Sequence, residues 1–374
     1  MQIHTDFDGA NIECLEINQA DNIRLRIKTD HNSEHLQWFY FRLTGAKGVD
    51  CRLVIENADQ VSYVDGFRGY QAAVSCGDGE WRRTETSFDG KHLIISHRPA
   101  TDSTYFAYFA PFTWERHRQL IDRALRSPLV QYHPLGQTLD GRVMELLQVG
   151  EYDSGKKTAW IIARQHPGET MAEWWMEGFI DRLLDQNDAV SRDALKHYVF
   201  YIVPNMNPDG SVRGHLRTNA VGKNLNREWL EPSMENSPEV FLVREKMQQT
   251  GVDFCFDVHG DEALPYNFIA GAQGIPSWND NKQQQLDAFQ HYLAKINSDF
   301  QTEKGYPVAA PGKANLTMCT SYIAEHFNCL AMTLEMPFKD NANAPIPETS
   351  WSPVRCQKLA HSCLDTILYI HSYL

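Results

Sequence analysis

Reactive side chains follow directly after four apolar runs of the chain. The runs are residues 157–164, 197–203, 252–258 and 329–335. The side chains that end or follow them are His166 with Glu169, the Asn-Pro-Asp-Gly segment 207–210, His259 and Glu335. Each run reads as a buried strand, and open α/β sheets bind ligands at the carboxyl ends of their strands. If the four runs form one sheet, we expect these side chains to surround one site.

Three of these residues have the chemistry of a metal site. His166 and Glu169 would supply one nitrogen and one oxygen from a single loop, and His259 would add a second nitrogen. Two His and one Glu, with a fourth position left for water, form the open geometry of catalytic zinc, so we expect one Zn²⁺ per chain. Taken singly, Glu169 would be explained as a negative charge that is favourable near a helix N-terminus. His259 would be explained as a hydrogen-bonded histidine of the core. Their coincidence at one sheet edge favours the metal site.

The fourth strand ends on a carboxylate in apolar surroundings. Segment 330–337 is almost wholly apolar apart from Glu335. A buried carboxylate is unfavourable unless it is paired or functional. A general base beside a zinc-bound water fits this position, and a structural salt bridge is the alternative.

A positively charged stretch lies between the second and third strands. Arg217 and the pair Asn226-Arg227 occur there. A guanidinium pairs bidentately with a carboxylate, and a second one could stabilise an oxyanion during zinc-assisted attack. A solvated basic loop is the alternative explanation of these residues.

The chain is long enough for two domains, since 374 residues exceed the roughly 250–300 that one hydrophobic core supports. Residues 1–125 predict an all-β sandwich, because short alternating strands are separated by Gly and Asp turns. Its expected strands are 22–28, 37–43, 51–56, 92–96 and 104–109. A helix with Thr113 as N-cap ends this domain, and Ser127-Pro128 marks the boundary.

Residues 126–374 predict an α/β domain with a mixed, largely parallel sheet flanked by helices. The expected helices are 170–184, 238–250, 283–297 and 354–372. Thr170 and Glu173 have the spacing of a capping box at the start of the first of these helices.

Composition excludes several classes of function. The net charge of −13 opposes a general nucleic-acid binder, and no apolar stretch is long enough to span a membrane. The N-terminus has no basic region followed by an apolar run, so we expect no secretory signal. Eight cysteines without a Cys-x-x-Cys pair are expected to be reduced, buried thiols of a cytoplasmic protein.

Six motifs in order resemble the zinc carboxypeptidases. They are His-Pro-Gly-Glu, Asn-Pro-Asp-Gly, Arg217, Leu-Asn-Arg, Asp-x-His-Gly and a late strand Glu. More narrowly, the chain resembles the cytosolic carboxypeptidase branch, as segments 105–112 and 138–142 and the N-terminal β domain also fit it. The resemblance implies an enzyme that removes C-terminal amino acids from peptide or protein tails.

The resemblance also implies a role for each site residue. His166, Glu169 and His259 would bind zinc, and Glu335 would be the general base. Arg217 would polarise the scissile carbonyl, and Asn226 and Arg227 would hold the terminal carboxylate. The family places a mobile tyrosine over that carboxylate; Tyr322 and Tyr306 are the candidates, and we favour Tyr322.

The branch includes deglutamylases, so we expect acidic C-terminal residues, chiefly Glu, to be preferred. Lys313, between His259 and Glu335, could supply a positive charge, although an exposed surface lysine is the simpler explanation. Two other functions stay open. A zinc-dependent deacylase of N-acyl amino acids would share the fold and the metal site. A non-catalytic protein that binds peptide tails would be expected to lack a ligand or the base. The sequence does not predict an oligomeric state.

Overall fold

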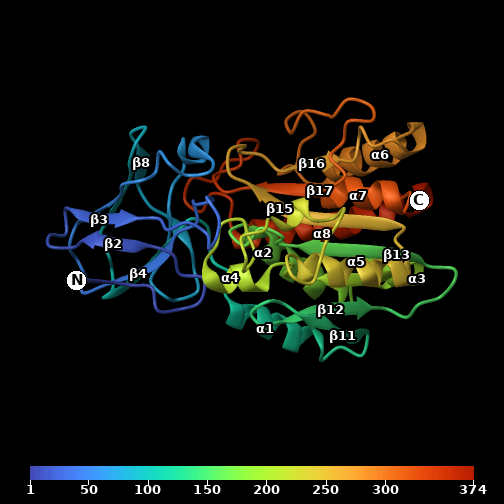
Figure 1. The fold of residues 1–374 in the computed structure, drawn as a ribbon, viewed down its shortest axis with the longest axis horizontal. Coiled ribbons are helices and arrows are strands. Elements are labelled where there is room, and N and C mark those ends of the chain that lie inside the picture. Colours follow the sequence, from blue (N-terminus) through green and yellow to red (C-terminus); the bar gives the residue numbers. More distant parts are fainter.

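Residues near the N-terminus form two five-stranded sheets packed face to face, in a computed structural model that describes residues 1–374 (Figure 1). One sheet has the order β1 (Gln2–His4), β4 (Tyr40–Thr44), β10 (Ser103–Ala107), β6 (Ala73–Ser75), β7 (Arg82–Arg83). The other has the order β2 (Glu13–Glu16), β3 (Ile23–Arg26), β5 (Cys51–Ile55), β9 (Leu93–His97), β8 (Thr86–Phe88). The predicted sandwich is confirmed.

One predicted strand of the sandwich begins later than expected. The aromatic run 37–43 enters the sheet only at Tyr40. Gln37 is buried, and its side-chain amide accepts from the Tyr63 N–H at 2.9 Å and donates to the Tyr63 carbonyl at 3.0 Å. This side-chain pairing replaces a strand ladder at that point.

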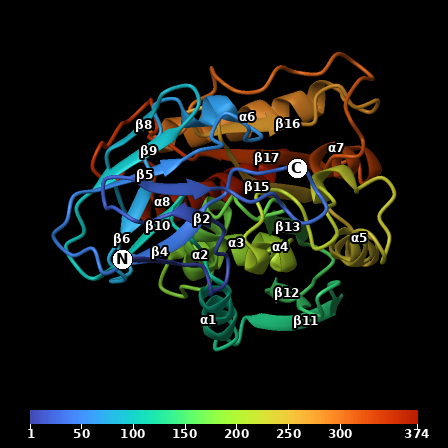
Figure 2. The same cartoon turned by 60° about the vertical axis from the view of Figure 1, so that its left-hand side comes forward.

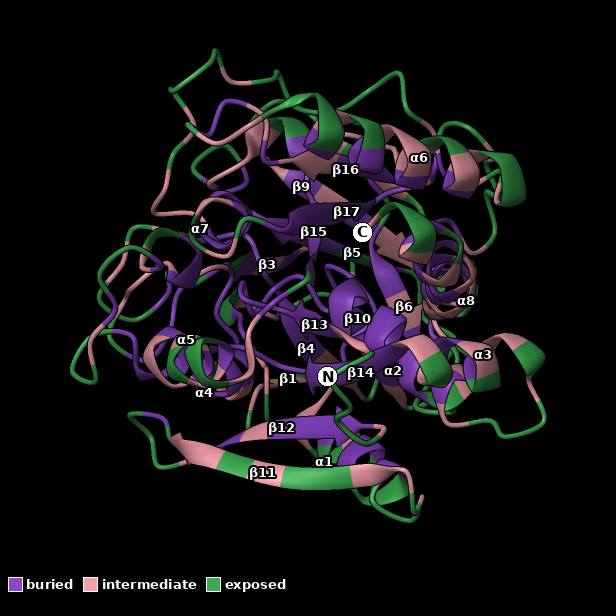
Figure 3. Cartoon of the chain, turned by 90° about the vertical axis from the view of Figure 1, so that its right-hand side faces the viewer, coloured by how far each residue is buried: buried purple, intermediate pink, exposed green.

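The larger domain is built on a seven-stranded mixed sheet. Its order is β11 (Val130–Gln137), β12 (Val143–Val149), β14 (Tyr198–Val203), β13 (Lys157–Ala163), β15 (Phe254–Asp261), β17 (Leu330–Pro337), β16 (Phe268–Gly271). The four predicted strands, β13, β14, β15 and β17, are its parallel centre. The hairpin β11–β12 and strand β16 pair antiparallel at the edges. Figure 3 shows the buried central strands and the largely exposed β11.

Helices cover both faces of this sheet. Alternate residues of β13 point to opposite cores, with Ile161 on one side and Ile162 on the other. The first face packs against α2 (Met171–Leu183), α3 (Ala189–His197), α6 (Asp280–Ile296) and α8 (Pro353–Ile370). The second packs against α5 (Pro238–Thr250) and α7 (Cys319–His326). Burial on both faces explains why these strands are continuous apolar runs rather than alternating ones.

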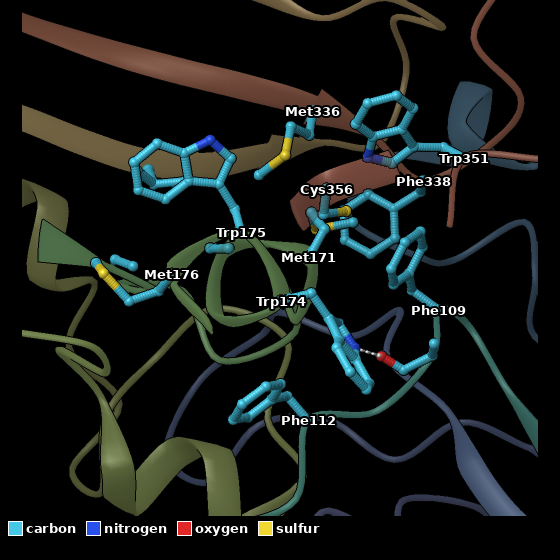
Figure 4. Packing of buried hydrophobic residues seen from close by; sticks show 14 of the residues in the cluster. Phe109, Phe112, Met171, Trp174, Trp175, Met176, Met336, Phe338, Trp351 and Cys356 are labelled. Carbon is cyan, nitrogen blue, oxygen red and sulfur yellow. Dashed lines mark hydrogen bonds between the residues drawn. The ribbon is translucent and has the colours of Figure 1, made fainter. Parts of the chain in front are cut away.

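The β-sandwich packs against the carboxyl ends of the central strands (Figure 2). Phe338, directly after β17, stacks on Tyr108 at 4.4 Å between ring centroids. Helix α1 (Trp114–Ala124) then begins at the predicted N-cap, where the Thr113 hydroxyl accepts from the Arg116 N–H. The Trp174 indole donates to the Ala110 carbonyl at 2.9 Å (Figure 4). Buried apolar residues therefore form one core that continues through both domains.

Two local expectations are wrong. Thr170 already has helical dihedral angles, and its hydroxyl donates to the Ala110 carbonyl instead of capping α2. The thiols of Cys14 and Cys76 are exposed, whereas the other six are buried, as expected. None of the helices is both long enough and apolar enough to cross a membrane.

The contact between α2 and α8 gives the first prediction. A Cβ atom on Gly178 would lie 2.5 Å from the Cα of Gln357. We expect Gly178→Ala to lower the free energy of unfolding by about 1–3 kcal/mol through overpacking, despite the better helix propensity of alanine. Urea denaturation measures this loss. Gly155, which is exposed and has only the Asp153 side chain nearby, is the control, and its alanine variant should change stability by less than about 0.5 kcal/mol. Equal stability of the two variants would contradict the close packing.

Candidate metal centre and catalytic site

The register of three parallel strands brings the predicted ligands together. Ala163, the last residue of β13, pairs with Val258 of β15, so the loop that follows runs beside His259. His259 in turn pairs with Glu335 of β17. Neighbouring strands lie about 4.8 Å apart, which sets the separation of these two residues. The sheet itself therefore places His166, Glu169, His259 and Glu335 around one point.

The side chains of His166, Glu169 and His259 form a buried group of potential metal ligands. The carboxylate oxygens of Glu169 lie 2.7 Å from Nδ1 of His166 and 2.8 Å from Nδ1 of His259. The two Nδ1 atoms are 3.2 Å apart. All four atoms face the same small volume.

The opposite nitrogen of each imidazole has its own acceptor. Nε2 of His166 lies 3.0 Å from Oδ1 of Asn224, and Nε2 of His259 lies 2.9 Å from Oδ2 of Asp257. The Asn224 oxygen is identified by the Asn226 N–H, which also donates to it at 3.0 Å. Protonation of Nε2 leaves a lone pair on each Nδ1, which is how outer acceptors orient metal-binding histidines.

Electrostatics at this group also suit a cation. Burial and Arg217 lower the pKa of His166 to about 3, so this imidazole is neutral near pH 7. Burial opposes charge on His259, but Asp257 and Glu169 raise its pKa well above the ordinary value. The two histidines hold the pKa of Glu169 below its usual range, although burial alone would raise it. A divalent cation bound here would displace the His259 proton, as metal binding requires deprotonated ligands. The donor set therefore fits zinc.

Glu335 has the environment of an unpaired buried base. Its Oε1 accepts from the Tyr306 hydroxyl at 3.2 Å, while Oε2 is buried and has no hydrogen-bond partner in the protein. Burial raises the pKa of this carboxyl well above its ordinary value, against the attraction of His259. The alternative of a structural salt bridge is not supported, because the only side-chain partner of Glu335 is the Tyr306 hydroxyl and no Lys or Arg pairs with it. A buried oxygen without a donor is unfavourable for folding and so points to function.

The two predicted arginines of the site differ in how far they are buried. Burial opposes charge on the partly buried Arg217, but Tyr63 and three carboxylates, Glu262, Glu169 and Glu335, raise its pKa. Arg227 is exposed, and its guanidinium donates to the Asn226 carbonyl at 2.6 Å. Oδ1 of the Asn226 side chain accepts from the Cys319 N–H at 2.9 Å. Burial and the charge of Arg217 lower the pKa of Arg227, so these two guanidinium groups, which differ in accessibility, lie near each other.

The preference for Tyr322 has no support in the structure. Tyr322 is buried on α7, where its ring stacks on His326 and packs near Trp229. Tyr306 instead lies on a loop, is 46% exposed, and donates to Asp261 at 2.6 Å as well as to Glu335. Tyr306 therefore replaces Tyr322 as the candidate tyrosine. Lys313 is exposed on its loop, in agreement with the simpler explanation.

Several residues around the site were not predicted from the sequence. Asp257 could have been found, because a residue two positions before His259 on a strand shares its face. Asn224 directly precedes the Leu-Asn-Arg motif, but the motif itself did not identify it as a site residue. Glu262 is buried next to Arg217 and Glu169, and Tyr63 reaches the site from the β-sandwich. No local pattern distinguishes these last two residues.

Sequence profiles of known families agree with this geometry. The zinc carboxypeptidase profile matches residues 119–358, which is more than half of the chain. The protein therefore belongs to the zinc carboxypeptidase family, whose members are peptide hydrolases that use zinc. The profile of the cytosolic carboxypeptidase N-terminal domain matches residues 3–109, so the β-sandwich is similar to the N-terminal domain of that branch.

Solved structures and sequence relatives agree as well. A metallo-carboxypeptidase from Burkholderia cenocepacia is 44% identical, with a TM-score of 0.97 over all of both chains. A Pseudomonas aeruginosa metallo-carboxypeptidase, solved with (2-guanidinoethylmercapto)succinic acid, is 41% identical with the same TM-score and full coverage of both chains. Mouse cytosolic carboxypeptidase 4 is 25% identical over 72% of this chain, and the match spans only 28% of the mouse protein. The predicted fold and enzyme class are confirmed.

The ligand group generates the second prediction. We expect His166→Ala and His259→Ala to lose stoichiometric zinc, because each removes one of three protein ligands. Zinc per chain is measured by elemental analysis after gel filtration, with circular dichroism as the check that the fold is retained. Cys363→Ala, which alters a buried thiol of α8 outside the ligand group, should keep zinc at the wild-type level. Wild-type zinc in both histidine variants would contradict the assignment.

Proposed function

We propose that the protein is a metallocarboxypeptidase that removes C-terminal amino acids from peptide or protein tails, with one zinc held by His166, Glu169 and His259. The observation that carries this proposal is the buried, unpartnered Oε2 of Glu335 in register with the ligand His259. A carboxylate oxygen without a donor in the protein, beside a group of metal ligands, is suited to accept a proton from the attacking water.

Each remaining residue has a proposed role in that reaction. Zinc, when bound, would polarise the substrate carbonyl and make water more acidic. Glu335 would accept the proton of the attacking water and pass it to the leaving amine. Arg217 would stabilise the negative charge that develops on the carbonyl oxygen, in a site where burial strengthens the interaction. Tyr306 would close over the bound residue and exclude water.

Recognition of a free C-terminus is assigned to Asn226 and Arg227. The Asn226 side-chain oxygen already accepts from Cys319, so its NH₂ group is directed away from that bond and can donate to a carboxylate. Arg227 is exposed enough to meet an incoming peptide and has a guanidinium that fits a carboxylate bidentately. These two groups would select the last residue of the chain.

The preferred C-terminal side chain stays a prediction. Glu was expected from the branch, but Lys313, the residue offered in its support, is exposed. Comparing kcat/KM for peptides ending in Glu, Leu and Lys tests the preference. We also propose a cytoplasmic location, on the sole ground that relatives are named cytosolic carboxypeptidases.

The two other functions have less support. A deacylase of N-acyl amino acids has less support, because the β-sandwich ahead of the catalytic domain and the Asn-Pro-Asp-Gly segment with Arg217 after it favour the peptidase. A short peptide assayed beside an N-succinyl amino acid separates the two activities. A non-catalytic protein that binds peptide tails would lack a ligand or the base, and all four residues are present.

The role of Glu335 gives the third prediction. We expect Glu335→Gln to lower kcat by about 10²–10⁴-fold, because an amide cannot accept the proton of water. Zinc content should stay at the wild-type value, since Glu335 is not among the three ligands. Steady-state kinetics together with metal analysis measures both quantities. Near-normal turnover in this variant would remove Glu335 from the mechanism.

Recognition of the terminal carboxylate gives the fourth prediction. A peptide with an amidated C-terminus lacks the charge that Arg227 would bind, which removes a charge-assisted bond of about 1.5–3 kcal/mol. We expect the free peptide to be cleaved at least about 10-fold faster than its amide at equal concentration. Mass spectrometry of the products follows both peptides in one mixture. Equal rates would contradict exopeptidase action and indicate an endopeptidase.

A further inference from the structure

A carboxylate of the β-sandwich holds the loop that carries Arg217. Oδ1 of Asp30 accepts from the Leu216 N–H at 2.6 Å, and Oδ2 accepts from the N–H groups of Arg217 at 2.8 Å and Thr218 at 2.9 Å. The Thr218 hydroxyl also donates to Oδ2 at 3.0 Å. Asp30 is buried, so these donors replace the water that its carboxylate oxygens would otherwise bind. One side chain of the N-terminal domain thus takes up three consecutive backbone N–H groups of the catalytic domain.

The peptide unit between Leu216 and Arg217 also bonds to the loop that carries His166 and Glu169. The Leu216 carbonyl accepts from the Gly168 N–H at 2.8 Å. The peptide between Leu216 and Arg217 is therefore bonded through its N–H to Asp30 and through its C=O to Gly168, which lies between His166 and Glu169. Bonds made on both sides of one peptide polarise and strengthen each other. A Cβ on Gly168 would lie 2.9 Å from the Leu216 oxygen, so this approach requires glycine.

The β-sandwich also contacts the Arg217 side chain and the ends of its loop. The Arg217 guanidinium lies over the Tyr63 ring, with Cζ 5.5 Å from the ring centroid. The Asn11 side chain donates to the Gly214 carbonyl at 3.0 Å, and the His31 N–H donates to Nε2 of His215 at 3.1 Å. Both the backbone and the guanidinium of Arg217 are therefore positioned from the other domain.

We propose that Asp30 is a positioning residue for the reaction. Through three backbone N–H groups it holds Arg217 where the guanidinium can reach the scissile carbonyl of a substrate. Through the same loop it supports the segment that carries His166 and Glu169. The proposal rests on the proposed role of Arg217. It makes the β-sandwich part of the catalytic machinery rather than an attached module. Displacing a catalytic group by about 1 Å can lower the rate by roughly 10²-fold, so a fixed carboxylate at this place has a large effect.

Three variants of the full-length enzyme test this role. Asp30→Asn puts an NH₂ group opposite backbone N–H donors, and Thr218→Val removes only the hydroxyl bond, whereas Thr218→Ser keeps it. We expect Asp30→Asn to lower kcat per bound zinc by about 10–100-fold with KM nearly unchanged, as for a lost transition-state interaction. Thr218→Val should give a smaller loss, and Thr218→Ser should restore wild-type kcat. If Asp30→Asn does not fold, the Thr218 pair alone decides.

A double-mutant comparison with Arg217 distinguishes a positioning role of Asp30 from a general loss of protein stability. In an Arg217→Lys background, Asp30→Asn should lower kcat by less than about 3-fold, since residues that act together are not additive. Arg83→Gln is the control, because Arg83 donates across the same interface to the Phe338 carbonyl at 2.8 Å without reaching Arg217. Its effect on kcat should be the same in both backgrounds.

Three results would overturn the proposal. The first is a wild-type kcat in both Asp30→Asn and Thr218→Val. The second is a loss of kcat on Asp30→Asn that is equal in the wild-type and the Arg217→Lys backgrounds. In each case Arg217→Lys would still be impaired, so the proposed function would stand. Wild-type kcat in Arg217→Lys is the third result, and it would also refute the role of Arg217 in the proposed function.

Discussion

The whole arrangement depends on keeping one carboxylate and two imidazoles together inside the protein. Their nitrogen and oxygen atoms lie within 2.7–3.2 Å of each other, with no lysine or arginine paired to Glu169. Such a buried group is favourable only if a cation is bound or a proton is shared. The register of β13, β15 and β17 imposes this approach, because each ligand lies at or just beyond a strand end. The apolar helices on both faces of the sheet then keep the strands in that register.

The β-sandwich contributes to the same constraint from the outside. It packs at the carboxyl ends of the strands, shares a continuous apolar core with the catalytic domain, and directs Asp30 and Tyr63 toward Arg217. The loop that carries Arg217 has no regular secondary structure, so its backbone N–H groups have no partners in a helix or sheet. The Asp30 carboxylate accepts from three consecutive N–H groups of this loop and so fixes its position. The division into two domains at about residue 125 therefore describes the chain but not the active site, which we infer uses both.

The sequence predicted those parts of the fold that local patterns determine. Continuous apolar runs identified the four central strands, and reactive residues at their ends identified the group His166, Glu169, His259 and Glu335. Contacts between distant segments were not predictable. The Thr170 hydroxyl bonds to Ala110 rather than capping its own helix, and Tyr306 rather than Tyr322 reaches Glu335. Asp30 and Tyr63 gave no signal, because their partners are more than 150 residues away in the chain.

We propose that the buried group His166, Glu169 and His259 binds one zinc ion. Crystals of the zinc-loaded protein, measured on either side of the zinc absorption edge, test it directly. We expect a single anomalous peak enclosed by Nδ1 of His166, Nδ1 of His259 and the Glu169 carboxylate, with Glu335 beside it and not bound. A peak held by other side chains, or no peak in protein that contains stoichiometric zinc, would contradict it.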